Sequence, residues 1–225
     1  MSRPLALVTG ASRGIGRAVA LALSPTHHVL VGGRDTDAVS DVVRELESAE
    51  PFLADLTDEA ALTTAVTGIG SLDVLVHSAG VVAFGPLADS TTSQWRETLE
   101  LNVIAPATLT RLLLPALRAA HGLVIFLNSG AGLTAHRGFA VYAASKFALT
   151  ALADSLRADE RGRVRVTSIH PGRVATDMQA RLTSLEGLPY IPDAHLDPVD
   201  VARGVRLAVD LPPDASLDAL RITPV

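Results

Sequence analysis

The sequence contains no cysteine, and this absence excludes several kinds of chemistry. Disulfide bonds, catalytic thiolates and cysteine-bound zinc all need a thiol that the chain does not have. Basic runs are also missing, because 24 acidic side chains outnumber 19 basic ones and give a formal net charge of −5. Such a chain offers no basic surface for phosphate backbones or anionic lipids. We therefore expect neither nucleic acid nor a membrane as a partner.

Long hydrophobic runs are scarce as well. The apolar run near the start, Leu5 to Val8, is too short for a membrane-spanning helix and is unlike a cleavable leader, so we expect a cytoplasmic protein. With 225 residues and 48% hydrophobic content, the chain can bury a sizeable core, and we expect one domain over residues 1–225. Seven scattered histidines, none spaced to share a helical face, give no reason to expect a metal.

Short apolar runs alternate with longer segments of helical periodicity. Runs without polar interruptions indicate strands that are buried on both faces, and helix-length connections make such strands parallel. The pattern predicts an α/β fold with a doubly wound parallel sheet. The expected strands include Leu5 to Val8, His28 to Val31, Val74 to Val76, Leu123 to Leu127, Arg165 to Ile169 and Leu217 to Thr223.

Boundary residues mark where several helices begin and end. Asp35 and Asp58 are expected to cap first helical turns, and His121 with the following glycine ends a long helix that begins near Thr92. One stretch, from Pro171 to Pro198, is rich in proline and glycine. Its length is typical of a functional or mobile loop, and we expect residues of about 173–197 to bound the substrate site.

A three-glycine turn joins the first expected strand to a helix. Gly10 permits a sharp turn, Gly14 lets the backbone approach a pyrophosphate, and Gly16 lets the helix pack tightly on the sheet. The free N–H groups and the dipole at the start of that helix favour negative charge. The turn therefore predicts a nucleotide site, although a merely tight turn would show the same glycines.

Arg34 follows the second strand, where an NAD-binding protein would carry an acid for the ribose 2′-OH. A guanidinium there suits a 2′-phosphate, and Arg13 within the glycine turn could add a second cation. The residues thus favour NADP over NAD. Two observations leave NAD open: both arginines could be solvated surface residues, and Asp35 is an acid next to Arg34.

Tyr142 and Lys146 are four residues apart at the start of an alanine-rich helix, so they share one helical face. A phenol has a pKa of about 10 and exchanges protons poorly near neutrality unless a cation stabilises its phenolate. Lys146 can supply that cation. Alternatively, the pair belongs to an ordinary amphipathic helix in which Tyr142 packs and Lys146 is solvated.

Two further polar residues have suggestive positions. Ser129 directly follows an apolar strand and therefore lies at the carboxyl end of the sheet, unless it merely caps its own turn. Asn102 is polar within an apolar helix and precedes Pro106 by four residues. Because proline has no N–H, the Asn102 carbonyl loses its helical donor and the helix should kink. Asn102 could instead hydrogen-bond to a neighbouring strand.

In spacing and order, these motifs resemble the short-chain dehydrogenase/reductase family, which implies a seven-stranded Rossmann sheet. The resemblance implies that Ser129 hydrogen-bonds the substrate oxygen, Tyr142 is the general acid/base, and Lys146 relays protons through a water held by Asn102. His77-Ser78 departs from the family's Asn-Asn, which puts side-chain contacts there in doubt. The implied cofactor-binding residues are Gly10, Ser12, Arg13, Gly14, Ile15, Gly16, Arg34, Asp55, Leu56, His77, Ala79, Gly80, Tyr142, Lys146, Pro171, Gly172, Val174 and Thr176.

The predicted function is therefore NADP-dependent interconversion of an alcohol and a carbonyl on a small molecule. Two alternatives are a catalytically silent NADP(H)-binding regulatory protein and the same chemistry with NAD. For Asp55, which matches the adenine-binding position of the family, the alternative is a turn residue before a helix. The resemblance also implies a homodimer or homotetramer. Phe84, residues 133–139 and residues 178–195 should bound the substrate pocket.

Overall fold

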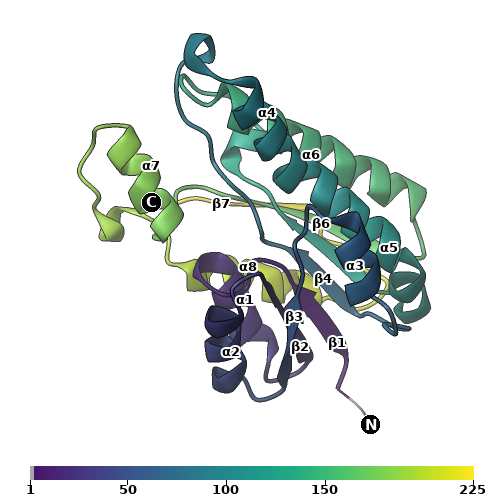
Figure 1. Cartoon of the computed structure of the whole chain (residues 1–225). Helices are drawn as coiled ribbons and strands as arrows, with labels where there is room; N and C mark the ends of the chain where they lie inside the picture. The colour runs from purple at the N-terminus through teal and green to yellow at the C-terminus, as the bar shows by residue number, and fades with distance from the viewer. Residues whose placement is uncertain (1–2) are drawn as a thin grey trace.

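The computed structural model describes residues 3–225 and contains one seven-stranded sheet in which every pairing is parallel. The strand order is β3-β2-β1-β4-β5-β6-β7 (Figure 1). The strands are β1 (Leu5–Val8), β2 (His28–Gly33), β3 (Ala49–Leu53), β4 (Val74–His77), β5 (Leu123–Leu127), β6 (Arg165–Pro171) and β7 (Ala219–Ile222). This arrangement confirms the predicted doubly wound α/β fold.

Helices cover both faces of the sheet. The α-helices are α1 (Gly14–Leu23), α2 (Thr36–Glu45), α3 (Glu59–Ala65), α4 (Thr92–Leu99), α5 (Ala105–Ala120), α6 (Ala140–Asp159), α7 (Asp177–Leu185) and α8 (Pro198–Val209). A π-helical turn, η2 (Glu100–Ile104), joins α4 to α5, and short 3₁₀ turns lie at η1 (Leu87–Asp89), η3 (Gly130–Gly132) and η4 (Pro192–Ala194).

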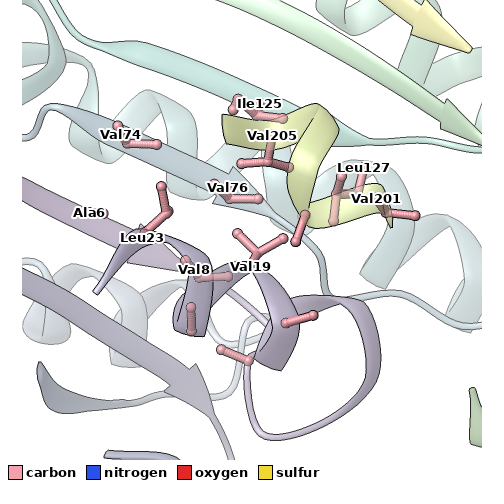
Figure 2. Close-up of a cluster of buried hydrophobic side chains, with 14 of the residues drawn as sticks. Ala6, Val8, Val19, Leu23, Val74, Val76, Ile125, Leu127, Val201 and Val205 are labelled. Carbon is pink, nitrogen blue, oxygen red and sulfur yellow. The ribbon is translucent and has the colours of Figure 1, made fainter. Parts of the chain in front are cut away.

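The core has two layers, one on each face of the sheet. Figure 2 shows the layer in which α1 and α8 pack on β1, β4 and β5; its labelled members include Val19 from α1, Val76 from β4 and Val205 from α8. The opposite layer contains Leu113 of α5 and Leu149 of α6. Consecutive strand residues therefore face different layers, which explains their uninterrupted apolar runs.

The expected strands form, with small differences in their ends. The sequence does not delimit the third strand, because β3 lies at the sheet edge and Phe52 is its one buried residue. Asp35 and Asp58 each accept two backbone N–H groups as N-caps. His121 ends α5 in the left-handed conformation, at φ 49°. All three boundary predictions are confirmed.

The helical stretch Thr92–Ala120 is long and apolar enough, by composition, to span a membrane. In this fold it contacts the sheet instead, because Leu109, Leu113 and Leu117 of α5 are buried in the second core layer. Its apolar character therefore has an explanation in the packing of α5.

The order of the strands places the site. All strands point the same way, but β1 to β3 are added toward one edge of the sheet and β4 to β7 toward the other. Open α/β sheets bind ligands at the carboxyl ends of the strands where this order switches, here between β1 and β4. The glycine turn follows β1, and Ala79 and Gly80 follow β4. α7 lies apart from both helical layers, beside this end of the sheet (Figure 1).

Candidate active site

The glycine turn is held by close backbone contacts that leave no room for side chains. Gly10 has φ 62°, and a Cβ there would lie 2.8 Å from the Ala79 Cα. A Cβ at Gly16 would lie 2.3 Å from the Gly10 carbonyl oxygen. Gly14 has φ 54° and faces Thr176. A side chain at Gly10 or Gly16 would collide with the backbone, and the left-handed φ of Gly14 also favours glycine, as expected from the sequence.

The start of α1 is suited to an anion. Arg13, the N-cap residue of α1, is in the extended conformation, and its side chain makes no capping hydrogen bond. The Arg13 side chain therefore leaves the first N–H groups of α1 uncapped. Free N–H groups and the helix dipole together favour a phosphate. With the Cβ-free surface at Gly14, this cradle fits the pyrophosphate of a dinucleotide, and Ser12 and Ile15 belong to the same turn.

A threonine that the sequence reasoning missed fastens the two sides of the crevice. The Thr9 Oγ1 accepts the backbone N–H groups of Ser78 and Ala79 at 3.0 and 3.2 Å. These bonds join the end of β1 to the segment after β4 and so fix Ala79 and Gly80 beside the glycine turn. In the sequence, the position of Thr9 directly before Gly10 is the signal that could have identified it.

The His77 side chain points into the core rather than into the crevice. Its Nε2 lies 2.8 Å from the Thr110 Oγ1, and its ring stacks on Phe126 with centroids 5.0 Å apart. Burial lowers the pKa of His77 to about 3, so the ring is neutral. A cofactor contact from His77 would therefore have to come from its backbone.

Arg34 and Asp55 face each other across the ends of β2 and β3. The Arg34 Nη1 lies 3.4 Å from the Asp55 Oδ2, and both side chains are exposed. The Thr57 backbone N–H, the Thr57 hydroxyl and Arg34 hold the pKa of Asp55 below its ordinary value. Asp35 turns away to cap α2, as described above. Gly33 lies against Ser12, which puts Arg34 and Arg13 on adjoining segments.

The remaining predicted cofactor residues have clear structural roles. Ile15 packs on the first core layer and Leu56 on the second. The Gly172 N–H donates to the Ile222 carbonyl at 2.7 Å, which ties the segment after Pro171 to β7. Val174 is buried and forms a parallel bridge with Leu196. Whether these residues also touch a nucleotide stays a prediction.

Lys146 is the only lysine in the sequence, so the composition alone could have singled it out as a candidate functional residue. It is 6% exposed, and its Nζ donates a hydrogen bond to the Leu127 carbonyl at 3.1 Å. The Nζ also lies 5.7 Å from the centre of the Tyr142 ring. Burial lowers the pKa of Lys146 to about 8. A surface lysine in a solvated helix face would show none of these features.

Tyr142 and Ser129 meet at the carboxyl end of β5. Burial raises the pKa of Tyr142, and hydrogen bonding with the Ser129 side chain opposes part of that rise. The Ser129 Oγ also accepts the Ala131 N–H at 3.1 Å, so Ser129 does cap its own turn. The structure thus brings Tyr142, Lys146 and Ser129 together, as the sequence predicted.

Asn102 lies in the π-helical turn η2, just before Pro106 on α5. It is 1% exposed, and its side chain makes three hydrogen bonds: Oδ1 accepts the Val81 N–H at 2.9 Å, and Nδ2 donates to the Val81 carbonyl at 2.9 Å and to the Ser145 Oγ at 3.0 Å. The Ser145 hydroxyl donates to the Tyr142 carbonyl. The side chain therefore links the segment after β4 to the helix of Tyr142.

Two phenylalanines border the tyrosine. Phe139 lies 6.4 Å from Tyr142 and 5.1 Å from Phe84, between ring centroids. A small cavity of about 60 Å³, lined in part by Phe84 and Gly138, lies beside them. A larger cavity of about 650 Å³ lies between α1 and α8, and it touches Gly14 but not Tyr142. Tyr142 and Lys146 therefore lie away from the larger cavity.

Residues 175–195, which include α7, project from the rest of the fold, and the two ends of this segment lie side by side. The Ala175 N–H donates to the Leu196 carbonyl, and the Leu196 N–H donates to the Arg173 carbonyl. Arg173 also holds Glu186 through two hydrogen bonds of 2.7 and 2.6 Å. Leu185, Leu188 and Ile191 are exposed. The expected substrate loop of residues 173–197 is therefore helical in part, because it contains α7 and η4. That this segment bounds a substrate stays a prediction.

Comparison with known proteins identifies the family. The short chain dehydrogenase family matches residues 4–187. An uncharacterized short-chain type dehydrogenase/reductase of Sinorhizobium fredii is 33% identical over 98% of this chain and 91% of its own length. Glycine betaine reductase ATRR of Emericella nidulans is 32% identical over all of this chain, which spans only 19% of that protein.

A solved structure supports the same assignment. A metagenomic short-chain oxidoreductase in complex with NADP superposes with a TM-score of 0.84 and 32% identity, over 100% of this chain and 98% of that one. Sequence and fold therefore agree, and this chain belongs to the short-chain dehydrogenase family of oxidoreductases.

Proposed function

We propose that the protein transfers a hydride between NADP(H) and the carbonyl or alcohol carbon of a small molecule, with Tyr142 as general acid/base. The observation that carries this proposal is the convergence of Tyr142, Lys146 and Ser129 at the carboxyl end of the sheet, beside an anion cradle. In this reading, residues 1–225 act as one dinucleotide-binding domain, and residues of about 173–197 bound the substrate.

The nicotinamide cofactor, when bound, supplies or accepts the hydride. The residues of this chain bind the oxygen of the substrate and exchange a proton with it. The Ser129 hydroxyl donates a hydrogen bond to that oxygen, which steadies the negative charge that develops on it. The Tyr142 hydroxyl gives the oxygen a proton in reduction and receives it back in oxidation.

The role proposed for Lys146 is to lower the pKa of Tyr142 by stabilising its phenolate. Burial alone raises the pKa of Tyr142, away from neutrality. A cation at about 6 Å, with an effective dielectric constant of about 20, stabilises a phenolate by about 3 kcal/mol, or about two pKa units. Below its own pKa of about 8, Lys146 carries that charge. The ammonium is therefore the group that makes Tyr142 useful as an acid and base.

Asn102 is proposed to connect Lys146 to solvent. Pro106, at the start of α5, has no N–H for the Asn102 carbonyl, and the chain forms a π-helical turn there. A carbonyl without a helical donor can hold a water molecule. The Asn102 side chain is occupied by Val81 and Ser145, so this role falls to its main-chain oxygen.

We propose NADP rather than NAD as the cofactor. The Asp35 Oδ1 accepts the N–H groups of Asp37 and Ala38, so this carboxylate has a role of its own as the cap of α2. Arg34 is exposed at this edge, and within residues 3–225 its charged partner is Asp55, at 3.4 Å. A guanidinium suits a 2′-phosphate, and the NADP complex of the related oxidoreductase supports the same choice.

We also propose a homodimer or homotetramer that forms through the outer faces of α5 and α6. Ile104, next to α5, is 48% exposed, and Phe147 on α6 is 44% exposed. Large apolar side chains at such exposure are consistent with an interface between copies. Light scattering on the purified protein gives the mass of the assembly, and a monomer would contradict this part of the proposal.

A substrate panel tests the function. Purified protein is offered alcohols, hydroxy acids, sugars, aldehydes and ketones with NADP⁺ or NADPH, and the absorbance of reduced nicotinamide is followed. We expect turnover of at least one substrate pair and a large loss of kcat in Ser129→Ala. A protein that binds NADPH but turns over no member of the panel would contradict the enzyme and favour a regulatory binding role.

A further inference from the structure

His170 is a buried histidine that the mechanism above does not use. It lies on β6, directly before Pro171, and is 2% exposed. Its Nδ1 lies 3.0 Å from the main-chain carbonyl oxygen of Ser129. A second donor, the Gly132 N–H, reaches the same oxygen at 2.9 Å. The carbonyl of the serine thus has two fixed partners, one from its own turn and one from the neighbouring strand.

The direction of the His170 bond follows from its acceptor. A carbonyl oxygen has no proton to give, so Nδ1 must carry the hydrogen. Burial lowers the pKa of His170, and the nearby Lys146 cation adds to that lowering. Asp154 and the hydrogen bond with Ser129 act in the opposite direction, while Arg221 acts with Lys146. The ring is therefore neutral near pH 7, in the tautomer with its hydrogen on Nδ1.

The His170 bond belongs to a set that fixes the segment after β5. The Asn128 N–H donates to the Ile169 carbonyl at 2.8 Å, and Lys146 donates to the Leu127 carbonyl. Donors from α6 and β6 thereby hold the carbonyls on both sides of Asn128. Because the Ser129 side chain leaves the backbone at this point, the orientation of its peptide sets where its hydroxyl points.

We propose that His170 is a positioning residue for Ser129: its Nδ1–H holds the serine carbonyl so that the Ser129 hydroxyl faces the substrate oxygen and Tyr142. The inference rests on the proposed function, because that function gives Ser129 the task of hydrogen-bonding the substrate oxygen. Misplacing a catalytic group by about 1 Å can cost roughly 100-fold in rate, so a single hydrogen bond that orients Ser129 is enough to matter.

Two substitutions separate the hydrogen bond from the bulk of the side chain. His170→Leu keeps a similar volume and removes the donor, and we expect kcat to fall roughly 10- to 100-fold with little change in NADPH affinity. His170→Asn places an amide N–H near the position of Nδ1 and should recover most of kcat. His28→Leu removes a half-buried histidine at the start of β2 and is the control for loss of an imidazole away from the crevice.

A double-mutant cycle tests whether His170 acts through Ser129. In the Ser129→Ala background there is no hydroxyl to orient, so His170→Leu should cost much less than it costs in the wild type. An equal fold-loss in both backgrounds would mean that His170 only supports the fold, and it would overturn the proposal. Full kcat in His170→Leu, or failure of His170→Asn to recover activity, would overturn it as well.

The hydrogen bond of His170 can also be tested without measuring enzymatic turnover, and this measurement does not depend on the proposed function. ¹⁵N NMR of the cofactor-free protein distinguishes the two histidine tautomers, and His170→Asn identifies the signal. We expect Nδ1 protonated and Nε2 bare near pH 7; the other tautomer would remove the proposed bond. If the tautomer is as expected but no substrate is found, the bond stands and the proposed function fails.

Discussion

The Nζ of Lys146 lies 5.7 Å from the centre of the Tyr142 ring, one helical turn further along α6. The same nitrogen donates to the Leu127 carbonyl, which fixes it at the end of β5. Burial is the cause of its lowered pKa. A buried ammonium whose pKa is near 8 can lose its proton within the range of an ordinary activity assay, so its charge should be visible in the pH dependence.

Carbonyl reduction should slow as the pH rises through about 8. Below that pH Lys146 is cationic and stabilises the Tyr142 phenolate, and above it the amine is neutral and that stabilisation is lost. Burial raises the pKa of Tyr142, so the lysine is expected to titrate first. The measurement is the pH profile of kcat/KM for reduction, with pH-independent substrates.

Because Lys146 is the only lysine, its titration can be observed directly. Protein labelled with ¹³C-lysine should show one ε-carbon signal whose midpoint lies near pH 8 rather than at about 10.4, the ordinary lysine value. A midpoint at the ordinary value would contradict the burial argument, even if the activity profile fell for another reason.

Arg34→Ala should change the choice of cofactor. The variant removes the cation proposed to meet the 2′-phosphate, so NADPH should bind about 10- to 100-fold more weakly while NADH binding is little changed. Titration calorimetry measures both affinities. Arg44→Ala is the matched control, because Arg44 is an exposed arginine on α2 that pairs with Asp41. Equal wild-type affinities for the two cofactors would contradict the 2′-phosphate argument.

Glu160 should stabilise the fold in a pH-dependent way. It is 3% exposed at the end of α6 and accepts two hydrogen bonds from Arg118, while Arg163 lies 3.2 Å away. The Arg118 hydrogen bonds hold the pKa of Glu160 below its ordinary value. Glu160→Gln should lower the free energy of unfolding by about 1 kcal/mol near neutral pH.

The sign of the pH effect follows from the lowered pKa. The stability that ionised Glu160 contributes is fully present above its unfolded pKa of 4.5 and is lost as the pH falls through the lower folded pKa. Urea unfolding near neutrality and in acid should therefore show a difference between wild type and Glu160→Gln that shrinks in acid. Glu59→Gln, which removes an exposed partner of Arg111, should have almost no effect at either pH.

Local signals were enough to predict much of the fold. Uninterrupted apolar runs identify β1 and β5 because both of their faces are buried. β3 could not be delimited in the same way, since its exposed edge position admits Glu50 and Pro51. Asp35 and Asp58 were recognisable because an N-cap acts within three residues of itself.

Contacts between distant segments were beyond the sequence. The bonds of Thr9 to Ser78 and of His170 to Ser129 join residues whose neighbourhood depends on strand order and register. Pro106 predicted a disturbed helix at Asn102, and the disturbance is a π-helical turn. The side-chain bonds of Asn102 to Val81 and Ser145 depend on tertiary packing and could not be read from spacing.

Tyr142→Phe tests the central claim most directly. The substitution removes one oxygen from a half-buried ring and leaves Lys146, Ser129 and the glycine turn unchanged. Removal of a general acid is expected to lower kcat by at least about 100-fold. NADPH affinity and the free energy of unfolding should stay close to those of the wild type. A Tyr142→Phe protein that retains wild-type turnover of any substrate found would contradict the assignment of Tyr142 as the general acid/base.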